Sequence, residues 1–105
     1  YIFKDLKFYN VAMINKNILK IRKDLDKLDD LFLQLIKKRT NLVNKVLDNK
    51  KFKKDIVDTK RIAVILKTIN NKSIKKKIDP LITNKIWKSM IRAYINYEFR
   101  NFKKK

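Results

Sequence analysis

The stretch that decides the fold is residues 18–46, ILKIRKDLDKLDDLFLQLIKKRTNLVNKV. Its apolar residues recur in alternating steps of three and four, at Ile18, Ile21, Leu25, Leu28, Phe32, Leu35, Leu42 and Val46. This spacing predicts one long amphipathic helix that ends near Asn49. At ~1.5 Å per residue the helix would be ~48 Å long, well beyond the ~26 Å spanned by a compact domain of this size. One small chain cannot cover such a helix, so we expect a homodimer.

The remaining sequence predicts two further helices and no strand. The charged, non-periodic segment 50–57 indicates a loop, and Asp58 with Thr59 supplies an N-cap for a short helix that ends near residues 70–71. A lysine-rich turn region follows, and Asp79 before Pro80 then predicts the start of a third helix. We therefore predict an all-α fold with one long, one short and one medium helix per chain, in an intertwined homodimer.

The composition excludes several classes of chemistry. The chain has no Cys and no His, which removes disulfides, zinc sites and His-based acid–base catalysis. It has no Gly, which removes the phosphate-binding and dinucleotide-binding loops. We therefore expect no cofactor and no metal. No apolar stretch approaches the roughly 18–20 residues of a membrane span, and residues 1–17 carry no secretory signal, so we expect a soluble, cytoplasmic protein.

The domain organisation is simple. We assign residues 18–102 to a single domain, residues 1–17 to an N-terminal extension and residues 103–105 to a basic tail. No internal repeat is visible.

The net charge of +19 is compatible with binding to nucleic acid. However, lysines supply 24 of the 29 basic residues and are scattered over all faces, which favours compositional bias as the main cause of the charge. We expect no nucleic-acid partner, and a non-enzymatic basic helical binding module stays open as an alternative. The arginines are more informative, because a guanidinium grips a carboxylate through two hydrogen bonds. They indicate an anionic ligand and are Arg22, Arg39, Arg61, Arg92 and Arg100.

Two cations interrupt the expected pattern of the first helix. Arg39 occupies the buried series between Leu35 and Leu42, where an unpaired guanidinium is costly, so an anion should meet it. Lys50 lies eleven residues further on and nearly on the same face. The two side chains could bracket a small dianion, although a structural ion pair for Arg39 and a solvated loop position for Lys50 stay open. Arg22 is about 25 Å from Arg39 along the helix and could reach the same ligand only from a partner chain.

One carboxylate interrupts the third helix. The apolar stripe through Trp87, Ile91 and Tyr94 continues to Glu98, the only Glu in the sequence. It is either a solvated helix end or a buried acid with a functional role. Asp58 and Arg61 are most simply a helix cap and an i,i+3 pair.

The ordered set of these residues resembles the all-helical chorismate mutases. Residues 18–29 and 35–39 carry the leucine–arginine, isoleucine–aspartate and arginine-rich signature of that family. The resemblance covers about residues 18–99 and continues at matching spacings through Lys50, Asp58, Arg61 and Asp79.

The resemblance implies a shared active site. In the family, two chains interlock their long helices and form two sites, each completed by the first arginine of the partner. Here Arg22 of the neighbouring chain, with Arg39 and Lys50 of the home chain, would hold the two carboxylates of chorismate. Lys50 would also face the ether oxygen of the substrate, and Glu98 would donate a second hydrogen bond to it.

The same resemblance assigns Asp58 and Arg61 to the pocket near the substrate ring. This chain differs from the family pattern at three positions. Ile62 stands where many members have a Glu or Gln that binds the ring hydroxyl. Tyr94 replaces a small hydroxyl residue, and Glu98 replaces a common Gln. The implied function is chorismate mutase, an isomerase of phenylalanine and tyrosine biosynthesis. The loss of the polar group at Ile62 keeps an isochorismate-pyruvate lyase on the same scaffold as the alternative.

Overall fold

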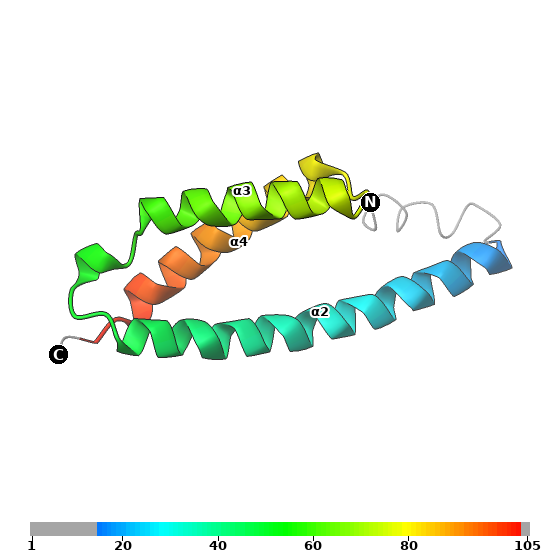
Figure 1. The fold of residues 1–105 in the computed structure, drawn as a ribbon. Coiled ribbons are helices and arrows are strands. Elements are labelled where there is room, and N and C mark those ends of the chain that lie inside the picture. Colours follow the sequence, from blue (N-terminus) through cyan, green and yellow to red (C-terminus); the bar gives the residue numbers. More distant parts are fainter. Residues whose placement is uncertain (1–14, 104–105) are drawn as a thin grey trace. The chain divides into compact units, whose positions relative to one another are not determined.

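The computed structural model describes residues 15–103, and this part of the chain is almost entirely helical (Figure 1). Its elements are α2 (Lys16–Asp48), the short 3₁₀ helix η1 (Lys53–Asp55), α3 (Thr59–Lys75) and α4 (Pro80–Asn101). No strand occurs among the described residues, so the predicted all-α class is confirmed. None of the described helices has the combination of length and apolar character that a membrane crossing requires. The chain divides into two compact units, Tyr1–Arg39 and Thr40–Lys105.

The Tyr1–Arg39 unit is described from residue 15 and consists of the first part of α2. The helix begins at Lys16, two residues before the predicted start, because the Asn15 side chain accepts a hydrogen bond from Asn17 N at 2.8 Å. Residues 1–14 of the predicted extension lie outside the described residues. Large apolar side chains on this part of the helix are mostly exposed, including Ile21, Phe32 and Leu35. The predicted long helix is confirmed, and the side chains of its apolar stripe are mostly exposed in the single chain.

The Thr40–Lys105 unit contains the end of α2 and the two later helices. The predicted loop over residues 50–57 includes η1 and then Ile56, which is only 3% exposed. Asp58 caps α3 as predicted, since its carboxylate accepts a hydrogen bond from Arg61 N at 2.9 Å. Asp79 caps α4 in the same way through Leu81 N, also at 2.9 Å. Both sequence-predicted helix starts are confirmed.

The predicted end of the second helix, near residues 70–71, is wrong, because α3 continues to Lys75. The reason is tertiary. Ser73 is buried, its hydroxyl donates to Ile69 O at 2.7 Å, and it shares a 2.8 Å hydrogen bond with the Thr83 hydroxyl of α4. Packing against α4 therefore extends the helix through a polar segment that by itself indicates a turn.

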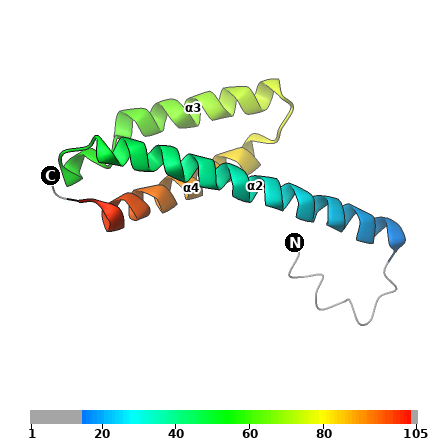
Figure 2. The same ribbon diagram turned by 90° about the horizontal axis from the view of Figure 1, so that it is seen from below.

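Residues after α3 make the sharp turn to α4 without a glycine. Lys77 adopts a left-handed conformation with φ 58°, which costs about 1 kcal/mol for a residue with a Cβ atom. The turn is closed by hydrogen bonds from Lys77 N to Ile74 O and from Ile78 N to Ser73 O, the pattern of a Schellman motif. As a result α3 and α4 form an antiparallel helical pair (Figure 2).

Candidate active site

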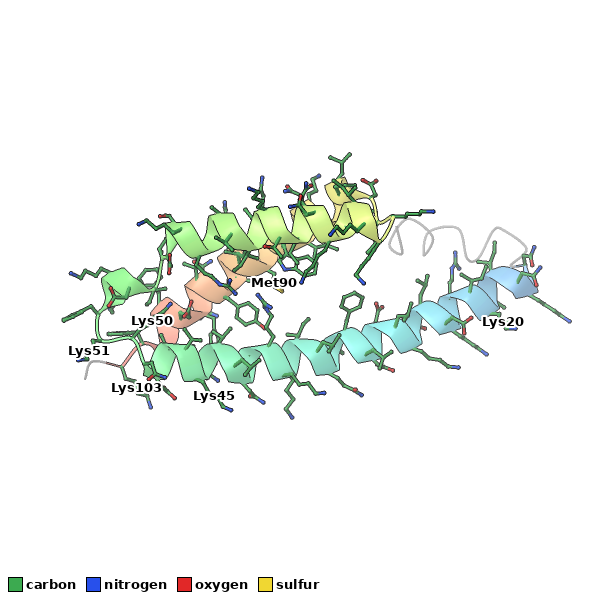
Figure 3. All side chains as sticks on the ribbon, viewed as in Figure 1. Lys20, Lys45, Lys50, Lys51, Met90 and Lys103 are labelled. Atoms are coloured by element: carbon green, nitrogen blue, oxygen red, sulfur yellow. The ribbon has the colours of Figure 1, made fainter. Side chains whose placement is uncertain are left out.

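The most distinctive polar contact is a partly buried ion pair between the loop after α2 and the last turns of α4. Lys50 Nζ donates to Glu98 Oε1 at 3.2 Å and to Ile56 O at 3.3 Å. Glu98 is only 7% exposed, and the Lys50 side chain lies beside the C-terminal part of α4 (Figure 3). Glu98 is therefore not a solvated helix end, and Lys50 is not a solvated loop lysine. Partial burial removes both charged groups from water, which is unfavourable, and their mutual attraction offsets part of this desolvation cost.

The ion pair follows from local structure. The loop after α2 turns at Lys50, whose backbone N–H donates to Leu47 O at 3.0 Å. Ile56, in the same loop, has a buried side chain, and its carbonyl oxygen accepts a hydrogen bond from the Lys50 ammonium group. Glu98 then approaches from α4. The Lys50 ammonium group is thus held by two acceptors, the Glu98 carboxylate and the Ile56 carbonyl oxygen.

Tyr94 lies one helical turn before Glu98 and belongs to the same surface of α4. Its hydroxyl oxygen is 2.8 Å from Thr40 Oγ1, and either group could donate the proton. The Tyr94 ring also packs edge to face on Tyr97, with ring centres 6.3 Å apart. Tyr94 is half-buried, and its side chain reaches from α4 to Thr40 near the end of α2.

Sequence reasoning missed the residues that support these groups. Besides Thr40, Asn44 lies one turn further along α2, and its side-chain oxygen accepts a 2.8 Å hydrogen bond from the Tyr97 hydroxyl. The available signal was a pair of polar residues four apart near the apolar stripe of α2. Their partners lie more than fifty residues away in the chain, so the signal could not identify them.

The residues predicted near the substrate ring gather at the start of α3. Asp58 and Arg61 are exposed, and the capping hydrogen bond joins the Asp58 carboxylate to the Arg61 backbone. Ile62 is half-buried on the next position of the same turn. Their placement at a helix start is as predicted, and their roles toward a substrate stay predictions.

Arg22 and Arg39 belong to the Tyr1–Arg39 unit, and both are half-buried. They are seventeen residues apart on one continuous helix, or ~25 Å along its axis. The two guanidinium groups of one chain therefore cannot hold the same small ligand. A site that uses both needs them from different chains.

The Thr40–Lys105 unit also has a polar hollow of about 350 Å³. It contains none of the predicted site residues and is lined by Asn44, Leu47, Asp48, Tyr97, Asn101 and Lys103. In residues 15–103, no three acidic side chains gather in a way that could hold a metal ion. Among the predicted site residues, the chemistry on offer is that of cations, the two carboxyl groups of Asp58 and Glu98, and the Tyr94 hydroxyl.

Comparison with protein families gives one match. The family model described as chorismate mutase type II matches residues 21–99, which is most of the chain and includes every predicted site residue. No curated protein and no solved structure matches the chain significantly.

Proposed function

We propose that this chain, which belongs to the chorismate mutase type II family, catalyses the rearrangement of chorismate to prephenate. The observation that carries the proposal is the partly buried Lys50–Glu98 pair, with Tyr94 one turn away. Family membership supports the reaction class, and the pair supplies two polar groups that fix each other through a hydrogen bond. Such preorganised groups are the main requirement of this reaction.

The reaction suits the chemistry of these residues. It is a pericyclic shift in which the ether C–O bond breaks while a C–C bond forms within the same molecule, without a covalent intermediate or a required proton transfer. The protein must select the compact conformer of the substrate and stabilise the negative charge that develops on the ether oxygen. No imidazole or thiol is needed, which agrees with a sequence that has neither His nor Cys.

We assign the roles within the site as follows. Arg39 and Lys50 bind the substrate carboxylates, and Lys50 also donates to the ether oxygen. Glu98, when protonated, donates a second hydrogen bond to that oxygen, and its contact with Lys50 supports a position beside the same atom. Tyr94 contributes a hydroxyl to the pocket. Asp58, Arg61 and Ile62 line the pocket at the start of α3, a position compatible with their capping geometry.

The proposed active form is a homodimer in which Arg22 of one chain completes the site of the other. The exposed apolar stripe of α2 supports this assembly, because a large contiguous apolar surface marks a protein interface. The ~25 Å between Arg22 and Arg39 supports the contribution across the interface. The excess positive charge would also attract a dianionic substrate.

A direct assay tests the function. Purified protein should consume chorismate and release prephenate, and Lys50→Ala should lower kcat by on the order of 10² or more, as expected when a transition-state donor is removed. The neighbouring Lys51 is exposed and provides the matched control, so Lys51→Ala should keep the wild-type rate. Pyruvate release from isochorismate without turnover of chorismate would identify the lyase instead. Equal loss in both lysine variants would contradict the assignment of Lys50.

A further inference from the structure

Two buried apolar side chains flank Lys50 in the sequence. Among residues 15–103, the apolar residues that are buried are Leu47 and Ile56, at 5% and 3% exposed. Each directs a backbone carbonyl group at Lys50. Leu47 O accepts a hydrogen bond from the Lys50 backbone N–H at 3.0 Å, and Ile56 O accepts one from the ammonium group at 3.3 Å. The small apolar core of the Thr40–Lys105 unit therefore contacts this lysine from both sides of the sequence.

The two carbonyl groups differ in what holds them. Leu47 lies within α2, where the hydrogen bonds of the helix fix the backbone. Ile56 lies in the loop between η1 and α3, and its backbone N–H closes η1 by donating to Lys53 O at 3.1 Å. Every other residue from 51 to 57 is exposed. The Ile56 side chain is therefore the one part of this segment that is anchored in the unit by burial.

The Lys50 ammonium group needs fixed acceptors because it lies at the end of a flexible side chain. A lysine side chain loses about 2 kcal/mol of rotamer entropy when it is held in one conformation. The Glu98 carboxylate is one acceptor, and we have assigned Glu98 to the ether oxygen of the substrate as well. The Ile56 carbonyl oxygen is an uncharged acceptor with no assigned contact to the substrate. Its position depends on the loop, and the loop depends on the buried side chain.

We propose that Ile56 is a positioning residue that acts through Lys50: its buried side chain fixes the loop after α2, and its carbonyl oxygen thereby sets the position of the Lys50 ammonium group in the site. The inference rests on the proposed function, because Lys50 must be the group that contacts the substrate. It adds an apolar residue to the site, one that acts through its backbone. A preorganised donor is worth more in the transition state than one that must be ordered during the reaction.

The first test changes the anchor. Ile56→Ala should lower kcat/KM for chorismate by roughly tenfold to a hundredfold, the range of one hydrogen bond to a charged group. Ile56→Val loses a single methylene group and keeps the branched shape, so its kcat/KM should stay within about threefold of the wild type. Both variants are assayed at a temperature at which circular dichroism shows them to be folded.

The matched control is the other buried apolar residue. Leu47→Ala removes a side chain of similar size and burial from the same unit, so it should lower the melting temperature about as much as Ile56→Ala. The helix holds the Leu47 carbonyl group whatever the side chain, so kcat/KM should change less than about twofold. The melting temperature thus reports on the lost core, whereas kcat/KM reports on the position of Lys50.

A double-mutant cycle tests whether Ile56 acts through Lys50. In a Lys50→Ala background, Ile56→Ala should change kcat/KM by less than about twofold, because the group that it positions is absent.

The carbonyl oxygen itself is tested in a chemically synthesised chain in which an ester replaces the peptide bond between residues 56 and 57. The ester keeps both side chains and makes the Ile56 oxygen a weaker acceptor. It should lower kcat/KM by roughly threefold to tenfold, the range of an ordinary hydrogen bond, and should have no effect together with Lys50→Ala. This chain carries the test if Ile56→Ala does not fold.

The outcomes separate the inference from the function. A folded Ile56→Ala variant with the wild-type kcat/KM, or an equal loss of kcat/KM in Leu47→Ala, would overturn the role of Ile56 and leave the proposed function standing. An effect of Ile56→Ala that is equally large with and without Lys50 would also overturn it, as would an ester chain with the wild-type kcat/KM. A folded wild-type protein that does not turn over chorismate would defeat the proposed function and the inference together.

Discussion

The two compact units differ in whether any apolar side chain is fully buried, although large apolar side chains are exposed in both, among them Leu81 at 78%. In the described part of the Tyr1–Arg39 unit, Phe32 is 56% exposed and Leu35 is 60% exposed. In the Thr40–Lys105 unit, Leu47 and Ile56 are 5% and 3% exposed. Isolated helices gain most of their stability from packing of an apolar face, so the first unit lacks in the single chain what the second unit already has.

The two units also differ in which site residues they carry. The Thr40–Lys105 unit positions Lys50, Tyr94 and Glu98 through contacts within one chain. The Tyr1–Arg39 unit carries the two arginines that we assign to substrate carboxylates. If a second chain covers the first unit, assembly and substrate capture depend on the same helix. Variants of each unit should therefore fail in different ways.

The largest effect is expected from a charge on the uncovered stripe of α2. Leu35→Asp should abolish the dimer and with it all activity, because an ionised carboxylate cannot be buried against a second apolar face without a large cost. Lys37 lies about 160° from Leu35 around the helix, so Lys37→Asp is the control and should stay dimeric. Light scattering at micromolar concentration measures the mass. A Leu35→Asp variant that is dimeric and active would show that the stripe is not the interface.

The next effect concerns Glu98, within the other unit. Glu98→Ala should lose on the order of 10² to 10³ in kcat, the usual effect of deleting a transition-state donor. Glu98→Gln keeps a hydrogen-bond donor at this position and should retain much more activity than Glu98→Ala. A Glu98→Gln variant as slow as Glu98→Ala would mean that Glu98 acts only by orienting Lys50.

A mixture of two variants tests whether the site is shared, and its activity should be about fourfold below that of the wild type. Arg22→Ala and Arg39→Ala should each be nearly inactive, since each removes a carboxylate contact from both sites. When they are refolded together in equal amounts, half of the dimers should be mixed, and each mixed dimer has one intact site. Roughly a quarter of the wild-type activity should return, as the two-fold symmetry requires. A verified mixed dimer without activity would place Arg22 outside the partner's site.

The smallest effect compares two helix caps. Asp79→Ala should lower the free energy of unfolding by about 1 kcal/mol, because Leu81 N loses its acceptor, and it should leave kcat/KM unchanged. Asp58→Ala removes a capping hydrogen bond of the same 2.9 Å length but should also lower kcat/KM. Urea denaturation and the chorismate assay measure the two quantities. Equal activity of the two variants would argue that Asp58 is a cap and nothing more.

Part of the site could be predicted from sequence because its cues are local. Arg39 and Lys50 were identifiable as cations near an apolar stripe, and the cap at Asp58 is a short-range signal that the structure confirms. Glu98 was visible as an anomaly, but periodicity alone did not separate a buried acid from a solvated helix end. Thr40 was not identifiable as a partner of Tyr94, since the two residues are 54 positions apart in the chain.

The sequence by itself determined the helices, their order and their starts. Apolar spacing, the two aspartate caps and Pro80 act within a few residues of the chain, so they need no knowledge of the rest of the fold. Only the tertiary structure decided where α3 ends and that Glu98 is buried against Lys50. These features depend on packing between segments far apart in the chain, and the energy of such contacts overrides local preferences that differ by less than a few kcal/mol.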